Sequence, residues 1–418
     1  MTAAPNDSYT LSEDLDASDL SPNAAAVAGT FTGTFNGNGY KILNLPTSLF
    51  QTVSGATIQN LVIQDAQITT SRSGILANVI QNQSLVENVF IVDSSISNGV
   101  DELGAFAGNL RNSTIRQSAS VNVSVKGLVA VGGIVGKTNG GALIDNCYVT
   151  GKVQGTYDHP TLGARVGGLA GWHGGGVIQN SYTQVQVIAP AQKGNGGLIG
   201  GPNTGSPVLQ NCLSMSSGAG YRIAGFDVLG SAKNLYEYSG STSATNITQA
   251  NRDQIKETDA IFYPALYRDA LGWNEGVWDL ALLAYGKRPN LRTAPQQDNN
   301  YGIPGYTQLL SQENYQPQRE LAYANLAKLM PFSDLRTWVE QGNRLPEGHP
   351  LTVQAVEFVL PLDQNGGLVT GLHRDRLDEI QAIRLVFRQG AMVEHPVSLQ
   401  KTMGDLVAMY TIQGIGLP

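Results

Sequence analysis

The sequence predicts a mainly β protein, in which a parallel right-handed β-helix (a solenoid) of about seven rungs precedes a small α+β domain. Two markers recur in the same phase and predict the solenoid. One is a glycine-rich stretch such as GGIVG or GGLAG. The other is an apolar-x-Asn-apolar pattern at intervals of 28, 29, 29, 34, 31 and 23 residues, whose third position is Asn60, Asn88, Gln117, Asn146, Asn180, Asn211 and Asn234.

The composition favours short strands and tight turns. Glycine supplies 49 of 418 residues and charged residues only 14%, against typical shares of about 7% and about 25%. Each repeat unit contains short runs with β-branched alternation, broken by Gly, Asn or Ser, as strands require. A unit of about 29 residues cannot bury its own apolar face, so the units must stack as rungs about 4.8 Å apart. We expect the Asn column to form an internal ladder of amide hydrogen bonds.

The ends of the repeats predict two caps. Residues 1–45 contain strand-like runs around an Asn-Gly turn at Asn36 or Asn38, which favours a tight hairpin and a cap before the repeats of residues 46–240. Residues 241–300 are expected to close the other end. Within them residues 247–266 look helical, and Trp273 and Trp278 are expected to plug the last rung.

Residues 301–418 predict the α+β domain. Apolar residues recur at helical spacing over residues 319–330 and stop at Pro331, which cannot continue a helix. A second helix is expected between Ser333 and Gly342. Three strands follow, in residues 351–362, 380–389 and 406–414.

The charge balance excludes two classes of partner. The formal net charge is −7 and the sequence pI about 5.3, whereas a nucleic-acid-binding domain needs a basic face. No apolar run reaches the length of a membrane span. We therefore expect no nucleic-acid partner and no membrane insertion.

Two stretches carry a family resemblance. Residues 131–151 (VGGIVGKTNGGALIDNCYVTG) and 166–184 (VGGLAGWHGGGVIQNSYTQ) resemble the GLUG repeat of Gram-positive surface proteins. Residues 319–345 resemble the segment that follows the repeats in the immunoglobulin-A protease-like family of zinc metallopeptidases. The resemblance implies a non-catalytic N-terminal or middle region of a secreted or cell-wall-attached bacterial protease.

The sequence departs from that family at its catalytic motif. HExxH places two zinc-binding histidines one helical turn apart, with Glu as the base. None of the five histidines (His159, His173, His349, His373 and His395) is followed by Glu. We therefore expect no catalytic residue and no cofactor in this chain, and zinc only in a catalytic domain outside it.

Three functions remain open. The first is an accessory scaffold that spaces the peptidase domain and contributes to docking of a host protein. Its implied partners are that peptidase domain and a host glycoprotein such as immunoglobulin A, with the chain itself a monomer. The second is an adhesin-type module that binds host protein or glycan by itself. The third and weaker one is a β-helix polysaccharide lyase or glycosidase.

The longest repeat interval suggests a binding site, because extra residues between rungs must loop out and loops on rigid scaffolds often bind ligands. Its candidate residues are Tyr157, Asp158, His159, Trp172 and His173. The simpler interpretation is a surface loop with a Trp packed on glycines.

Asp65 and Asp93 are weak candidates for a cation site. Each lies five residues after its repeat Asn, so the two should stack in adjacent rungs, followed by Asn122. Paired carboxylates suit calcium or a retaining glycosidase. Asp and Asn are also the ordinary residues of a repeated turn.

Cys147 and Cys212 directly follow the repeat Asn, with Ser181 between them in the same column. Two rung steps separate their Cα atoms by roughly 9–10 Å, beyond the reach of a disulfide. We predict two free, inward-facing thiols.

Overall fold

The computed structural model describes the chain in segments, and it divides by contacts into two units. One unit comprises residues 1–259, 270–273 and 291–297, and the other comprises residues 260–269, 274–290 and 298–418. The described residues are 6–99, 101–157, 163–190, 193–202, 208–225, 232–241, 243–246, 253–258, 261, 265–280, 283, 288–295, 353–359, 382–387 and 392–396.

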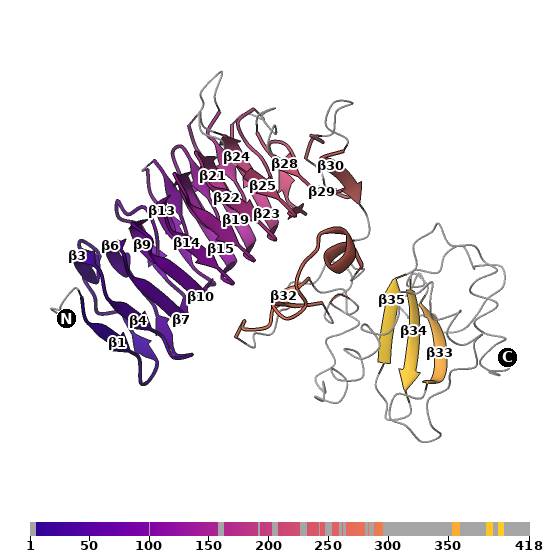
Figure 1. Ribbon diagram of the computed structural model, residues 1–418, viewed down its shortest axis with the longest axis horizontal. Coiled ribbons are helices and arrows are strands. Elements are labelled where there is room, and N and C mark those ends of the chain that lie inside the picture. The colour runs from indigo at the N-terminus through magenta and orange to yellow at the C-terminus, as the bar shows by residue number, and fades with distance from the viewer. Residues whose placement is uncertain are drawn as a thin grey trace, which may run out of the picture. The chain divides into compact units, whose positions relative to one another are not determined.

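The first unit is a parallel β-solenoid, as predicted (Figure 1). Its largest sheet contains β1 (Ser8–Thr10), β2 (Leu15–Asp16), β4 (Thr34–Asn36), β5 (Lys41–Leu43), β7 (Thr57–Gln64), β8 (Gln67–Ile68), β10 (Leu85–Val92), β11 (Ser95–Ser97), β14 (Thr114–Arg116), β15 (Ala119–Gly127), β18 (Leu143–Asp145), β19 (Tyr148–Gly155), β22 (Val177–Gln179), β23 (Tyr182–Ile188), β25 (Val208–Gln210), β26 (Leu213–Ser214), β27 (Ser217–Gly218), β28 (Ala232–Lys233), β29 (Leu235–Tyr238) and β30 (Ile255–Thr258). A second sheet, here called the outer-column sheet, contains β3 (Val27–Phe31), β6 (Phe50–Ser54), β9 (Ala77–Gln81), β13 (Ala107–Arg111), β17 (Val135–Asn139), β21 (Ala170–His173) and β24 (Ile199–Pro202). A third, narrow sheet contains β12 (Leu103–Gly104), β16 (Val131–Gly132) and β20 (Val166–Gly167).

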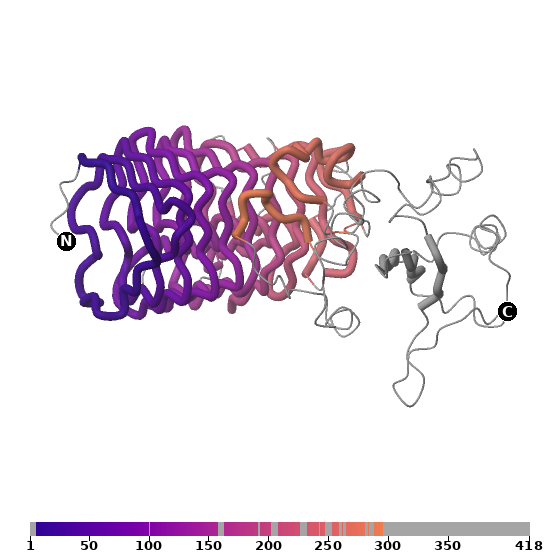
Figure 2. Tube along the Cα trace, turned by 90° about the horizontal axis from the view of Figure 1, so that it is seen from below, coloured from indigo at the N-terminus to yellow at the C-terminus, as the bar shows by residue number. Residues whose placement is uncertain are grey.

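The rungs stack in register, as Figure 2 shows in a view from below. Each rung aligns equivalent repeat residues, as where Ile115 pairs with Ile144 and Ile144 with Ile178. These isoleucines are fully buried. The core is thus a continuous apolar column inside the coil, which no single rung could form alone.

The repeated Asn residues form the predicted column, and its physical reason is the backbone. Asn60, Asn88, Asn146, Asn180 and Asn211 all have φ between 51° and 55°. This left-handed region is costly for most residues, but Asn tolerates it. The Asn side chains are half-buried at a corner of the coil. The prediction that their ladder lies inside the coil is therefore wrong.

Side-chain amides join successive corners. Asn88 donates to Asn60 at 2.8 Å, and Asn60 donates to Asn36 at 3.1 Å. Further along, Asn211 donates to Asn180 at 3.2 Å, and Asn180 donates to the Asp145 carboxylate at 2.8 Å. These bonds fix the register of the rungs that they join. The ladder is interrupted after Asn88, whose amide oxygen has no partner among the described residues.

The glycine-rich markers are sites of close backbone approach. A Cβ added to Gly136 would lie 2.2 Å from the backbone carbonyl carbon of Glu102 in the preceding rung. A Cβ added to Gly171 would lie 2.3 Å from the backbone carbonyl carbon of Ala130. Only glycine leaves room for this contact, which explains why the last Gly of the marker recurs.

Both cysteines are free and buried, as predicted. Cys147 Sγ donates to the Asp145 carbonyl at 3.4 Å and Cys212 Sγ to the Gln210 carbonyl at 3.1 Å. Ser181 makes the same bond, to the carbonyl two residues before it, at 2.6 Å. Burial raises the pKa of the Cys212 thiol to about 12, and it raises the pKa of Cys147 well above its usual range. The thiols therefore act as small, weakly hydrogen-bonding core groups.

The two ends of the stack differ from the expectation. Parallel pairing joins β1 to β4 and β4 to β7, so the N-terminal residues form rungs and the predicted hairpin is wrong. At the other end, Ile255–Thr258 is a strand that pairs in parallel with β29, where a helix was predicted. Ile255 is buried beside Leu235 in this added rung. Pairing with an existing strand edge has overridden local helical preference.

Trp273 does not plug the last rung. Its indole N–H donates to the Asn211 carbonyl at 2.9 Å, and its ring stacks on Tyr182 at 6.2 Å between centroids. Tyr182 in turn stacks on Tyr148 at 5.1 Å. Trp273 thus covers the flank of the solenoid, before the rungs of β29 and β30. Trp278 is buried and belongs to the other unit.

The second unit contains an antiparallel sheet of β33 (Val353–Val359), β34 (Ala382–Phe387) and β35 (Met392–Pro396). The first two confirm predicted strands. The two predicted helices and the strand at residues 406–414 lie outside the described residues. The remaining elements are the π-helical turn η1 (Leu266–Ala270), β31 (Trp278–Asp279) and β32 (Asn290–Leu291). Within the described ranges no helix is long and apolar enough to cross a membrane.

Candidate binding site

The outer-column sheet carries a column of side chains that changes chemistry from rung to rung. The register aligns Asn109 with Lys137, Lys137 with Trp172, and Trp172 with Gly201. Each of these residues directly follows the last glycine of its repeat marker. Successive residues of a strand face opposite sides. His173 is therefore inside and buried, whereas Trp172 is outside and half-buried.

The predicted binding residues are only partly brought together. Asp158 and His159 lie outside the described residues. Tyr157, at the start of that loop, is 43% exposed. Trp172 and His173 are neighbours in β21 but lie on opposite faces of the sheet. Trp172 and Tyr157 are therefore the described surface members of the set.

His173 is a core residue. Its ring accepts a hydrogen bond at Nδ1 from the Thr138 hydroxyl at 2.7 Å and donates from Nε2 to the Val208 carbonyl at 3.2 Å. This pair of partners suits the neutral ring. Burial lowers the pKa of His173 to about 4. His173 is thus held neutral and hydrogen-bonded, away from any ligand.

Two cations lie over the ring of Trp172. The guanidinium carbon of Arg165 is 3.9 Å from the ring centroid, and the ammonium of Lys137 is 4.6 Å from it. Both distances are within the range of a cation–π interaction. The buried indole N–H of Trp172 has no hydrogen-bond partner. A basic, aromatic surface site with one unused donor is thus present here.

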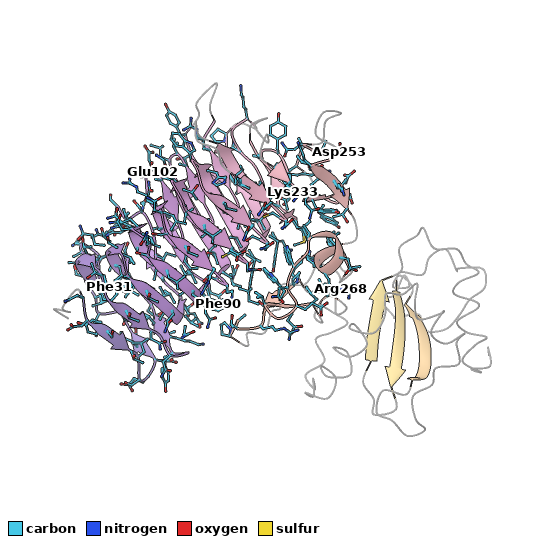
Figure 3. All side chains as sticks on the ribbon, viewed as in Figure 1. Phe31, Phe90, Glu102, Lys233, Asp253 and Arg268 are labelled. Atoms are coloured by element: carbon cyan, nitrogen blue, oxygen red, sulfur yellow. The ribbon has the colours of Figure 1, made fainter. Side chains whose placement is uncertain are left out.

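Lys137 is neutralised by Glu102. Its ammonium is 3.0 Å from one carboxylate oxygen of Glu102, and the other oxygen accepts a bond from the Asn109 amide at 2.8 Å. Figure 3 labels Glu102 on the flank of the solenoid opposite Phe90, which lies in the column continued by Tyr148 and Tyr182. The Lys137–Glu102 pair and the column of Phe90, Tyr148 and Tyr182 therefore lie on different flanks of the solenoid.

Arg165 has no counter-ion among the described residues. No carboxylate of that part of the chain pairs with it, whereas Arg116 pairs with Glu87 and Arg222 with Glu237. Burial lowers the pKa of the Arg165 guanidinium. Its backbone has φ 53°, and the equivalent residues Glu102 and Ala130 have φ 54° and 56°. This conformation is therefore a repeated left-handed corner of the coil and not a feature peculiar to Arg165.

Asp65 and Asp93 stack as predicted, because their preceding residues Gln64 and Val92 are register partners. Both aspartates have positive φ, at 57° and 48°, as does Asn122. The Asn122 amide donates to Asp93 at 2.7 Å. The column is a repeated left-handed corner, which accounts for Asp and Asn there. Across the described ranges, no cluster of three or more His, Cys, Asp or Glu residues could hold a metal ion.

Sequence reasoning found Trp172 but missed Arg165, Lys137 and Glu102. One signal was present for Lys137, since it occupies the same marker position as Trp172 one repeat earlier. Arg165 and Glu102 each directly precede a short strand of the narrow sheet. The residue type at that position differs from repeat to repeat. The contacts of Arg165 with Trp172 and of Glu102 with Lys137 join residues of different columns. A repeat alignment does not report such contacts.

Comparison with known families supports the resemblance. Residues 1–93 match the family described as the M26 IgA1-specific metallo-endopeptidase N-terminal region, and residues 127–154 match the GLUG motif. The family resemblance is confirmed. The chain is homologous to the N-terminal region of the immunoglobulin A1 protease and zinc metalloprotease family.

The related proteins are much longer than this chain. An immunoglobulin A1 protease of Streptococcus sanguinis is 26% identical over 389 residues, which cover 86% of this chain and 20% of that protein. Zinc metalloprotease ZmpC of Streptococcus pneumoniae serotype 4 is 24% identical over 421 residues, which cover 97% of this chain and 21% of that protein. This chain thus spans about a fifth of the length of these relatives.

A solved structure of an IgA1 protease has a similar fold. It superposes with a TM-score of 0.52 and 20% sequence identity, over 95% of this chain and 31% of that chain. At that identity the match supports the fold alone.

Proposed function

We propose that this chain is a non-catalytic accessory region of a secreted or cell-wall-attached zinc metalloprotease. It spaces the peptidase domain and contributes to docking of a host glycoprotein such as immunoglobulin A. The observation that carries the proposal is the match of residues 1–93 to a metallo-endopeptidase N-terminal region, on a solenoid whose rungs are tied by side-chain hydrogen bonds. The chain acts as a monomer, and its second partner is its own peptidase domain.

The corner ladder supports a spacing role. Amide bonds between successive rungs, such as Asn88 to Asn60 and Asn211 to Asn180, resist sliding of one rung on the next. The rise of about 4.8 Å per rung then sets a fixed length. A stiff rod of fixed length can hold a bound substrate at a set distance from a catalytic domain.

The chemistry of the described residues supports a non-catalytic role. His173 is buried and neutral, and the carboxylates Glu87, Glu102 and Glu237 are committed to ion pairs. The zinc of the proposed protease belongs to a catalytic domain outside this chain.

A direct assay tests the absence of catalysis. Purified chain incubated with immunoglobulin A1 and added Zn²⁺ should give no cleavage fragments on a denaturing gel. Fragments that appear with the protein and vanish with a chelator would contradict the proposal.

Removing one rung tests the spacing role. Deletion of residues 87–115 from the longer protease joins Val86 to Arg116, which the register already places at the position of Glu87 one rung earlier. We expect several-fold slower cleavage of intact immunoglobulin A1, with unchanged cleavage of a short hinge peptide. Equal rates on both substrates, before and after deletion, would remove the spacing role.

An adhesin-type module is the second candidate. The unpaired Arg165 beside Trp172 favours it, because this site needs no second domain to bind a ligand. Binding of immunoglobulin A1 or of glycans by this chain alone, with no effect of rung deletion on cleavage, would favour the adhesin function.

A further inference from the structure

The outer side of the solenoid contains two polar groups that its own residues leave unused. The indole N–H of Trp172 is buried without an acceptor, and the Arg165 guanidinium has no counter-ion in the described part of the chain. Buried donors in native proteins are nearly always paired. Because the guanidinium lies 3.9 Å from the ring of the same tryptophan, the pair indicates a place for an external acceptor.

Stacking leaves the hydrogen-bonding edge of Arg165 free. Its guanidinium carbon is 3.9 Å from the Trp172 ring centroid, and no described residue accepts a hydrogen bond from its N–H groups. This planar fork matches a carboxylate with two parallel hydrogen bonds, so the site is shaped for a bidentate anion.

The surrounding charges limit the ligand to a single negative charge. Lys137 is already paired with Glu102 at 3.0 Å, so Arg165 supplies the one uncompensated positive charge of this cluster. A doubly charged phosphate would leave excess charge near the Glu102 carboxylate. The net charge of −7 also opposes a polyanionic partner.

The surface beside the guanidinium suits a sugar ring. Gly201 is the register partner of Trp172 on the next strand, so the position directly beside Trp172 on β24 has no side chain. An apolar indole surface beside a guanidinium fits a ring that carries a carboxylate and C–H groups.

We propose that Arg165 and Trp172 form a binding site for the carboxylate of an acidic sugar residue, of the uronic or sialic acid class. Arg165 makes the bidentate contact, Trp172 supplies the ring surface, and the Lys137–Glu102 pair holds the cluster in place. The site does not depend on the proposed accessory role, since it needs only this chain.

Titration of the purified chain tests the site. The probes are the methyl glycosides of glucuronic acid and N-acetylneuraminic acid, with methyl glucoside and acetate as matched controls. The readout is the indole N–H resonance of Trp172, assigned by its loss in Trp172→Phe, together with calorimetry. We expect an acidic glycoside to move the resonance saturably, with at least tenfold weaker binding of both controls.

Variants separate the contact from the fold. Arg165→Asn keeps a residue that tolerates the left-handed backbone but removes the guanidinium, and it should weaken binding tenfold or more. Arg165→Lys keeps the charge without the fork and should bind less tightly than the parent. Lys152→Gln changes an exposed lysine of β19 and should bind as the parent does.

Several results would overturn the proposal. They are no saturable shift with either acidic sugar, equal affinity in Arg165→Asn, or acetate binding as well as the glycosides, which would mean an adventitious ion only. Tighter binding of an acidic peptide than of either glycoside would assign the site to a protein partner instead. Circular dichroism of each variant distinguishes lost binding from lost folding.

Discussion

Two neighbouring side chains of β21, which face opposite sides of the solenoid wall, differ in how fully their polar groups are used. His173 and Trp172 are adjacent in β21, yet both ring nitrogens of His173 are hydrogen-bonded inside, whereas the indole N–H of Trp172 outside has no partner. Inside, the aligned polar residues Thr138 and His173 are hydrogen-bonded to each other. Outside, the aligned residues Lys137 and Trp172 differ.

This contrast teaches where the repeat constrains the sequence. An inner or corner residue must fit the rungs on either side, so the same small set of residues recurs. An outer residue meets solvent and can change without disturbing the stack. Stability should therefore depend on the repeated columns, and recognition on the outer column.

The largest effect is expected at a repeated glycine. Gly171→Ala should lower the free energy of unfolding by about 3 kcal/mol or more, because the added Cβ would lie 2.3 Å from a backbone carbon of Ala130. Urea unfolding measures the loss. Gly99→Ala is the matched control, since its added Cβ meets nothing within 4 Å. Equal losses at both positions would contradict the close-approach explanation.

His173 should make stability depend on pH. Because the pKa of His173 falls from 6.5 to about 4 on folding, the unfolded chain takes up a proton first as the pH drops. Its contribution is complete above pH 6.5 and is lost on acidification towards pH 4, by about 3 kcal/mol in total. Unfolding free energies at pH 7 and pH 4.5 should differ more in the parent than in His173→Gln. An equal difference in both proteins would show that His173 titrates normally.

The Asn corners should have a smaller, separable effect. Asn180→Ala should cost about 2 kcal/mol, because it removes ladder bonds and places Ala in the left-handed region. Asn180→Gly keeps the backbone conformation and should cost only about 1 kcal/mol. Chemical denaturation of the pair measures the difference. If both variants cost the same, the side-chain ladder rather than the backbone selects Asn.

The inner column should accept exchange between its own residues. Cys147→Ser should change the unfolding free energy by less than about 1 kcal/mol, because Ser181 makes the equivalent hydrogen bond one rung later. In the parent protein, both thiols should react slowly with a thiol reagent until urea unfolds the chain, since both are buried with raised pKa. Rapid reaction in the native state would place a cysteine outside.

The same contrast explains how much the sequence could predict. The period places Asn60, Asn180 and the two cysteines correctly, because a fixed repeat translates directly into columns. It does not predict that Trp273 covers a flank or that Ile255 adds a rung, because both depend on pairing with a distant surface. The stack of Arg165 on Trp172 joins two different columns, so repeat spacing contains no signal for it.

The central claim is that the repeated columns determine stability and the outer residues determine recognition. Thermal unfolding with and without an acidic glycoside tests it most directly, because one measurement reports stability and ligand stabilisation together. Asn180→Gly should melt below the parent but keep the ligand-induced rise in Tm. Arg165→Asn should melt close to the parent and show no rise. Loss of both properties in either variant would contradict the account, since stability and recognition would then depend on the same residues.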